Sequence, residues 1–285
     1  MANFTGTSGN NTWTGTNSAE TATGVGGNDT LSGGGGRDTI YGGTDNDIVS
    51  GDAGNDSVFG DAGNDFVYGG DDNDTVYGGD GTDYVDGGLG NDSAYGDAGN
   101  DSVYGGDGND SIYGGDGDDL VDGGAGNDTV DGGAGDDTLV GGAGNNALYG
   151  GADNDRFVGG AGADTFYGGS GQDNLDYTYS TAGVTVNLST GVLSGGAAAN
   201  DSYGGGIDGA YGSNYADVLT GFNDSSSSGD IYTNQFYGQG GNDTITGDVG
   251  HVLEDMVRLW RALPKKPEAA QTAEWKASVE KWRAR

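Results

Sequence analysis

A nine-residue period dominates the sequence between Gly24 and Asp176. Seventeen consecutive units fit this period without a gap, and position 1 of every unit is Gly. Position 6 is Asp in sixteen units, Asn146 being the exception, and position 8 is always apolar. A short fixed period predicts a solenoid, in which each unit is one structural element that stacks on its neighbours.

Each unit contains a strand signal and a turn signal. Thr75–Tyr77 shows the strand signal, with the middle side chain facing in and its neighbours facing out. The preceding six residues, 69–74, form the turn, because glycine adopts the positive φ values that a reversing chain needs. Two units then make one coil, so residues eighteen apart stack about 4.8 Å from each other.

The stacked coils place position-6 carboxylates in rows. Neighbouring charges about 5 Å apart repel by about 0.8 kcal/mol even in water, so the rows oppose folding unless a cation neutralises them. Asp is also a common turn former, but turn formation alone leaves this repulsion uncompensated. Carboxylate and carbonyl oxygens from neighbouring turns form the kind of cage that Ca²⁺ takes.

The unit Gly-Gly-x-Gly-x-Asp-x-apolar-x resembles the repeat of the RTX, or hemolysin-type calcium-binding, family. The resemblance implies an all-β fold, a right-handed parallel β-roll, with several Ca²⁺ ions held by position-6 carboxylates and turn carbonyls. The expected metal ligands are the residues that match position 6: Asp29, Asp38, Asp47, Asp56, Asp65, Asp74, Asp83, Asp92, Asp101, Asp110, Asp119, Asp128, Asp137, Asp155, Asp164, Asp173, Asp217 and Asp243.

Composition agrees with a chain that needs metal to fold. The 285 residues include 65 Gly, no Cys and a formal net charge of −35, and only 32% are hydrophobic. Such a chain buries little apolar surface and has no disulfides, so bound metal is the expected staple. The acidity argues against nucleic acid as a partner. No apolar run approaches the ~20 residues of a membrane span.

The sequence divides into four parts. Residues 1–23 are degenerate repeats that cap the array, with Trp13 expected to plug the open core, and 24–176 are the main array. Residues 177–249 contain a predicted strand at 182–189, a Ser-rich loop at 223–229 and a second, shorter run of repeats. Residues 250–285 are predicted to be a basic, amphipathic helical tail. The tail is interpreted as a docking or capping element, an export signal or a frame-shifted end.

One face of the predicted roll carries an aromatic row. Position 9 of alternate units is aromatic seven times in eight, with Asp131 as the interruption. Stacked aromatics stabilise neighbouring strands, and an exposed flat row also suits self-association or binding to glycans or a solid lattice. The residues of this possible surface ladder are Tyr41, Phe59, Tyr77, Tyr95, Tyr113, Tyr149 and Tyr167.

Catalytic residues are scarce. The chain has one His and no Cys, and its carboxylates are better explained as metal ligands, so we expect no enzymatic activity. The resemblance implies secretion from a Gram-negative bacterium through a type I exporter, to the medium or the cell surface. Three functions remain open: a structural or matrix calcium-binding protein, an adhesin-like or ice-binding protein that uses the Tyr/Thr face, and the accessory roll of a separated secreted enzyme.

Overall fold

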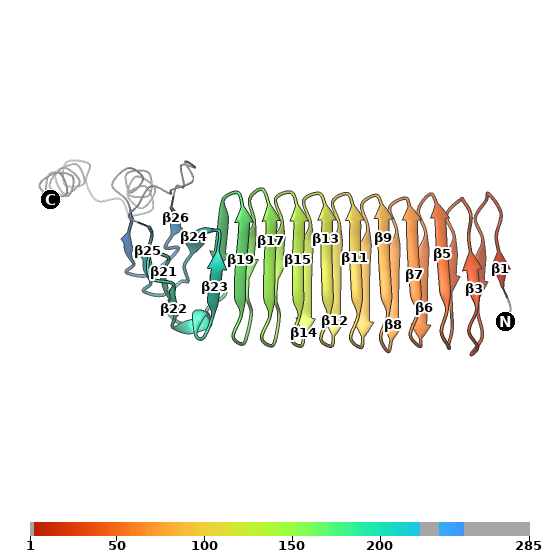
Figure 1. Cartoon of the computed structure of the whole chain (residues 1–285), viewed down its shortest axis with the longest axis horizontal. Helices are drawn as coiled ribbons and strands as arrows, with labels where there is room; N and C mark the ends of the chain where they lie inside the picture. Colours follow the sequence, from red (N-terminus) through yellow and green to blue (C-terminus); the bar gives the residue numbers. More distant parts are fainter. Residues whose placement is uncertain (1–2, 223–233, 248–285) are drawn as a thin grey trace, which may run out of the picture. The chain divides into compact units, whose positions relative to one another are not determined.

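The structure, a computed structural model, describes residues 3–222 and 234–247, which form an all-β parallel solenoid. The first twenty strands alternate between two sheets, so that each pair of consecutive strands completes one of ten coils (Figure 1). The β-roll expected from the nonapeptide period is therefore confirmed as a parallel solenoid of stacked coils.

The strands belong to three sheets. The first contains β1 (Phe4–Thr5), β3 (Thr21–Thr23), β5 (Thr39–Thr44), β7 (Ser57–Ala62), β9 (Thr75–Asp80), β11 (Ser93–Ala98), β13 (Ser111–Asp116), β15 (Thr129–Ala134), β17 (Ala147–Ala152), β19 (Thr165–Ser170) and β23 (Ser202–Gly205). The second contains β2 (Thr12–Thr14), β4 (Thr30–Ser32), β6 (Ile48–Ala53), β8 (Phe66–Asp71), β10 (Tyr84–Leu89), β12 (Ser102–Asp107), β14 (Leu120–Ala125), β16 (Thr138–Val140), β18 (Arg156–Val158), β20 (Asp173–Asp176), β24 (Ile207–Tyr211) and β26 (Gln235–Tyr237). The third contains β22 (Val192–Ser194), β21 (Thr185–Asn187), β25 (Val218–Thr220) and β27 (Thr244–Thr246).

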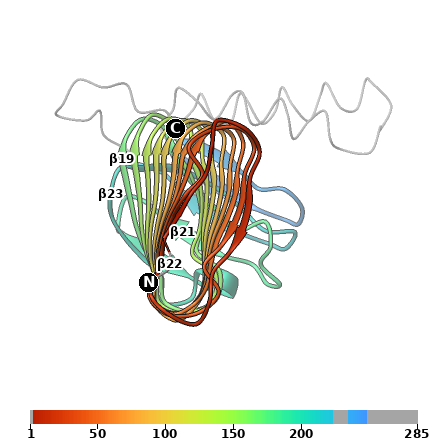
Figure 2. The ribbon, with the colours of Figure 1, turned by 90° about the vertical axis from the view of Figure 1, so that its right-hand side faces the viewer.

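From β1 to β20, neighbouring strands in each main sheet pair with a constant shift of eighteen residues. Val85 of β10 lies beside Val103 of β12, and Tyr95 of β11 lies beside Tyr113 of β13. Viewed along the stack, successive coils lie over one another (Figure 2). Position-8 side chains of both sheets face the interior and are almost completely buried, so the core consists of one apolar residue per strand.

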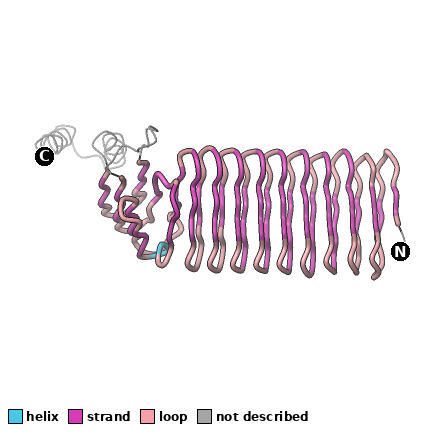
Figure 3. The backbone as a smooth tube through the Cα atoms, viewed as in Figure 1, coloured by secondary structure: helices cyan, strands magenta, loops and turns pink. Residues whose placement is uncertain are grey.

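The central strands are longer than the period predicted. β9 continues from Thr75 through Gly78 and Gly79 to Asp80, and only residues 81–83 turn the chain toward the next strand (Figure 3). Gly78 faces the interior and is buried, whereas Gly81 has a φ of 155° and supplies the turn. The expected six-residue turn was wrong, because β9 includes the first three residues of the unit that begins at Gly78, and Gly79 lies beside Asp97 of the next coil in the sheet.

The degenerate N-terminal units keep the fold of the array. β1, β2 and β3 continue the two sheets, and the rings of Phe4 and Trp13 stack with centroids 5.8 Å apart. Both rings pack against the first buried core residues. The aromatic pair therefore covers part of the apolar row at the N-terminal end of the described solenoid.

After β20 the chain departs from the period. The strand predicted at 182–189 spans only Thr185–Asn187, and it forms an antiparallel hairpin with β22, which the sequence did not suggest. A 3-10 turn, η1 (Gly196–Ala198), leads to β23 and β24, which rejoin the two main sheets with a register shift. The units around Asp217 and Asp243 form β25 and β27 of the third sheet.

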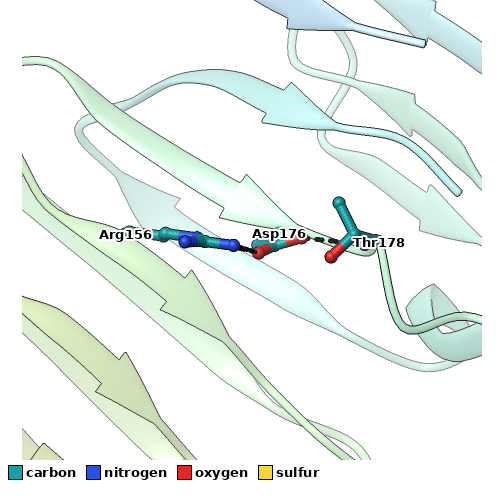
Figure 4. A network of polar contacts seen from close by, with 3 residues as sticks. All are labelled: Arg156, Asp176 and Thr178. Atoms are coloured by element: carbon teal, nitrogen blue, oxygen red, sulfur yellow. Dashed lines mark hydrogen bonds and ion pairs between the residues drawn. The ribbon is translucent and has the colours of Figure 1, made fainter. Parts of the chain in front are cut away.

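An ion pair joins the last coils of the array. Arg156 of β18 donates to Asp176, and the amide of Thr178 donates to the other oxygen of the same carboxylate at 2.8 Å (Figure 4). The Asp176 side chain is buried, and the guanidinium lies 5.6 Å from the centroid of the Tyr211 ring. Arg156 thus links β18 to β20 and β24, where the nonapeptide register ends.

The Ser-rich loop predicted at 223–229 and the helical tail predicted at 250–285 lie outside the described residues. Among the residues that are described, no helix has the length and apolar character needed to cross a bilayer.

Candidate metal centre

Position-6 carboxylates form two continuous rows inside the turns. Each is at most 4% exposed, and one oxygen accepts a hydrogen bond from the main-chain amide eighteen residues earlier. The amide of Asp83, for example, donates to Asp101 Oδ1 at 2.8 Å, and the amide of Asp101 donates to Asp119 Oδ1 at 2.8 Å. We call these rows the odd ladder (Asp29, Asp47, Asp65, Asp83, Asp101, Asp119, Asp137, Asp155 and Asp173) and the even ladder (Asp38, Asp56, Asp74, Asp92, Asp110, Asp128, Asn146 and Asp164).

The second carboxylate oxygen of every ladder Asp has no hydrogen-bond partner, although it is buried. This holds for all sixteen aspartates predicted as ligands in the main array. A buried oxygen of an ionised carboxylate without a donor is costly, and such groups in native proteins need a compensating partner. Sixteen equivalent donorless oxygens in register therefore point to a cation as the missing partner.

Position-1 glycines leave the space into which these oxygens project. A Cβ placed on Gly78 would lie 2.7 Å from Asp83 Oδ2 and 2.7 Å from the carbonyl oxygen of Gly96 in the next coil. The same two kinds of oxygen surround the corresponding position at Gly105, from Asp110 and Gly123. The invariant glycine therefore keeps open a small space beside one carboxylate and one carbonyl oxygen.

The electrostatics of the rows disfavour free carboxylates. Burial, together with repulsion from neighbouring ladder carboxylates, raises the pKa of Asp65, Asp74, Asp101 and Asp137 to about 7 and that of Asp155 to about 8. The amide hydrogen bond lowers each pKa, but it does not offset burial. Without a cation, part of the ladder therefore binds protons near neutral pH.

The donor set fits calcium. No group of three or more His, Cys, Asp or Glu side chains converges on one point within residues 3–222 and 234–247. An ion held here would take its side-chain oxygens from the ladder aspartates and its remaining ligands from turn carbonyls. Ca²⁺ accepts such all-oxygen sets of six to eight ligands, whereas Zn²⁺ prefers nitrogen and sulfur.

Both ladders extend beyond the main array at the N-terminal end. The amide of Asn11 donates to Asp29 Oδ1, and the amide of buried Glu20 donates to Asp38 Oδ1, both at 2.6 Å. The degenerate units therefore keep the amide side of the ladder. At position 6 itself, these two units have Asn11 and Glu20 in place of aspartate.

At the C-terminal end, the ladders reach two aspartates that sequence reasoning missed. The amide of Asp164 donates to Asp201, and the amide of Asp173 donates to Asp208. Both carboxylates are buried, and burial raises their pKa to about 6. Short fragments of the repeat are present around both residues. Asn200-Asp201-Ser202 has the same sequence as Asn91-Asp92-Ser93 in the main array. Asp208 begins an Asp-x-apolar-x-Gly segment, which matches positions 6 to 9 of a unit and position 1 of the next. The irregular spacing concealed both from a search with a fixed period.

Two further positions differ chemically from the ladder. Asn146 Nδ2 donates to Asp164 Oδ1 at 3.0 Å and occupies the space beside Gly141 where other units place the free oxygen. Asp217 accepts hydrogen bonds at both oxygens, from Val184 and Ser213, so its carboxylate is already satisfied. Asp243 accepts the amide of Asp217 at 3.1 Å.

The aromatic residues predicted as a surface ladder lie together on the first sheet. The rings from Tyr41 to Tyr113 stack with centroids 4.7–4.9 Å apart and interplanar angles of 1–11°. Tyr149 and Tyr167 form a second stack at 4.7 Å. We keep the name aromatic ladder for Tyr41, Phe59, Tyr77, Tyr95, Tyr113, Tyr149 and Tyr167. Since the ring faces cover one another, the ladder exposes mainly ring edges and hydroxyls.

This arrangement of glycines, inward carboxylates and stacked coils defines a class of calcium-dependent repeat protein. The model of the RTX calcium-binding nonapeptide repeat family matches the chain over residues 14–175, in overlapping segments, and again over 228–251. The matches cover more than half of the sequence, so the chain belongs to the RTX calcium-binding repeat family. No curated protein matches it.

Proposed function

We propose that this chain is a secreted structural protein whose repeat array folds when it binds calcium outside the cell. The observation that carries the proposal is the sixteen buried carboxylate oxygens of the two ladders that have no hydrogen-bond donor. Calcium would satisfy these oxygens and relieve the repulsion within each ladder. Because the core contributes only one apolar side chain per strand, the free energy of ion binding becomes much of the free energy of folding.

The same chemistry supports a role at the cell surface or in the extracellular matrix of a Gram-negative bacterium. A chain that stays unfolded at low cytosolic calcium can pass through a type I exporter and fold outside. A rigid, strongly anionic roll then needs no catalytic group to serve as a surface or matrix component. We propose accordingly that the protein is not an enzyme, and that its carboxylates bind metal rather than transfer protons.

The test is a calcium titration of chelator-treated protein, followed by far-ultraviolet circular dichroism. We expect an unfolded metal-free chain and a strand signal that appears at about 10⁻⁴–10⁻³ M Ca²⁺, as at extracellular-type sites. A parallel titration with Mg²⁺ is the control, because Mg²⁺ demands stricter octahedral geometry and keeps its water. Metal-free protein that retains its full strand signal at pH 7.5 would contradict the proposal.

A second candidate function is adhesion or lattice binding through the first sheet, and the aromatic ladder favours it. The seven residues of the ladder are uncharged and regularly stacked, although Asp61, Asp97 and Asp116 line the depressions beside them, so a neutral surface ligand could approach the ladder without charge repulsion.

The test of this second candidate compares the triple variant Tyr77→Ser, Tyr95→Ser, Tyr113→Ser with the variant Tyr68→Ser, Tyr104→Ser on the second sheet. Loss of self-association, glycan binding or ice binding in the triple variant alone would support adhesion. If both calcium-loaded variants sediment and bind as the wild type does, the ladder is structural only.

A further inference from the structure

The aromatic ladder is interrupted once, at Asp131 of β15. Asp131 lies beside Tyr113 of β13 on one side and beside Tyr149 of β17 on the other. Each of these rings is within 4° of parallel to its outer neighbour, at 4.9 and 4.7 Å. The two rings that border the gap therefore present open faces to each other, about 9.6 Å apart at their centroids, or two coil spacings.

The carboxylate in the gap has no partner. Asp131 is half-buried, and no residue in the described part of the chain donates a hydrogen bond to it or forms an ion pair with it. Asp122, at the same position of the second sheet, instead accepts the amide of Gly124 at 3.0 Å. The gap thus combines two aromatic faces with an uncompensated anion.

The second sheet contains the same arrangement with the gap already filled. Asp86 lies between Tyr68 and Tyr104, again in neighbouring strands. There the ring of Tyr84 lies 5.8 Å from Tyr68 and 5.1 Å from Tyr104, and its hydroxyl points to the Asp86 carboxylate at 3.5 Å. In the first sheet the residue equivalent to Tyr84 is Thr129, which has no ring. The Tyr84 ring is tilted by 46° against Tyr68 and by 33° against Tyr104, so the second sheet shows that a ring with a hydrogen-bond donor fits beside such an aspartate without parallel stacking.

We propose that the gap formed by Tyr113, Asp131 and Tyr149 is a binding slot for a guanidinium group, as carried by an arginine side chain of a partner. The missing rung of the ladder is one planar group thick, and a guanidinium is planar and stacks on aromatic faces. Placed midway, it lies about 4.8 Å from each ring centroid, within the range of cation–π attraction. Its paired N–H groups can donate to the Asp131 carboxylate.

The surroundings of the slot favour a cationic partner. A depression of about 400 Å³ adjoins Tyr113 and is lined by Tyr95, the carboxylates of Asp97 and Asp116, and Gly133 and Ala134 of β15. A chain with a formal charge of −35 attracts basic peptides, and Asp97 and Asp116 add negative charge beside Tyr113, one wall of the slot. An arginine-containing peptide segment is the occupant that matches these features.

The test uses the calcium-loaded full-length protein and three capped tripeptides, Gly-Arg-Gly, Gly-citrulline-Gly and Gly-Lys-Gly, in calorimetric or ligand-observed NMR titrations. Citrulline keeps the planar shape without the charge, and lysine keeps the charge without the plane. We expect the arginine peptide to bind about tenfold more tightly than either of the others. Equal affinity for the arginine and citrulline peptides would overturn the proposal.

Variants locate the site. Asp131→Tyr completes the ladder and should abolish arginine binding, whereas Asp86→Asn, in the filled gap of the second sheet, should leave it unchanged. Tyr84→Ser empties that second gap and should raise the number of arginine sites from one to two. Binding by Asp131→Tyr at the wild-type affinity would refute the slot. Because the slot requires stacked coils, the strand signal of each sample separates this result from a failure of calcium-dependent folding.

Discussion

At the scale of single residues, the position-1 glycine and the position-6 aspartate of one unit act as a pair. The glycine has no side chain because the aspartate oxygen of its own unit and a carbonyl of the next coil occupy that space, as at Gly78, Asp83 and Gly96. The presence of glycine in a repeat is usually explained by the turn conformations that it allows, but Gly78 lies within strand β9. The absence of a side chain at Gly78 leaves room for these two oxygens.

The change Gly78→Ala tests this pairing. The new methyl group would lie 2.7 Å from both Asp83 Oδ2 and the Gly96 carbonyl, and the carbonyl belongs to the main chain and moves only with it. We expect a loss of about 1–3 kcal/mol in the free energy of unfolding at saturating calcium, as for other overpacked sites, and a weaker calcium response. Gly9→Ala is the control, because no atom lies within 4 Å of the added methyl. Equal urea midpoints for both variants would argue against the pairing.

Asn146 is the second residue with a distinct prediction. Its amide donates to Asp164, so it stabilises the even ladder without a cation but offers no free carboxylate oxygen. We expect Asn146→Asp to raise the apparent calcium affinity several-fold, because an oxygen and a charge are gained at that coil. Calcium titrations of both proteins by circular dichroism measure this effect, and equal midpoints would contradict this account.

At the scale of the elements, the two carboxylate ladders make stability depend on pH. Their carboxyl pKa values are raised in the metal-free fold, for example to about 7 at Asp74 and Asp101 and to about 8 at Asp155. The folded state therefore binds more protons than the unfolded chain, whose Asp pKa is about 3.9, so the metal-free fold gains stability as pH falls through 8 to 6.

We accordingly expect protons bound to the ladder carboxylates to stabilise the fold in part when calcium is absent. In metal-free buffer, the strand signal should increase from pH 8 to pH 5, while the calcium concentration needed for folding at pH 5 should exceed that at pH 7.5, because protons compete for the same oxygens. Circular dichroism across this range measures both effects. A metal-free strand signal that falls on acidification would show that the ladders do not control folding.

The elements also show how far the sequence could predict the structure. The fixed period predicted the strand pairing with its shift of eighteen residues, and it identified the sixteen aspartates in which the structure then shows one buried oxygen without a hydrogen-bond donor. The sequence did not predict that the strands continue through the glycine pairs. Glycine usually weakens a strand, and here the pairing with strands of neighbouring coils stabilises the longer strand. Asp201, Asp208 and the β21–β22 hairpin depend on tertiary contacts after the period ends, where no repeat fixes the register. Tyr84 in the Asp86 gap likewise depends on side-chain packing between strands.

At the scale of the whole array, stability should accumulate between neighbouring coils, because each coil contacts only those beside it. Each ladder aspartate accepts an amide from the preceding coil, and in most units its free oxygen and a carbonyl of the following coil border the same small space, as at Gly78. We therefore expect calcium binding at one coil to order the surfaces to which the next ion binds. A change in the middle of a ladder should interrupt this coupling, whereas a change at its end should only shorten it.

The pair Asp110→Asn and Asp38→Asn tests the coupling with the same chemical change. Asp110 lies between Asp92 and Asp128 in the even ladder, and its substitution leaves an uninterrupted run of four aspartates from Asp38 to Asp92. Asp38 follows Glu20 at the N-terminal end, and its substitution leaves a run of five. We expect Asp110→Asn to make the calcium-induced folding transition less steep and to shift its midpoint several-fold upward, and Asp38→Asn to change the midpoint by less than about twofold. Calcium titrations by circular dichroism, with stopped-flow chelation to measure ion release, would show the difference. Identical curves for the two variants would mean that the coils bind calcium independently, and that stacking rather than shared ions makes the array cooperative.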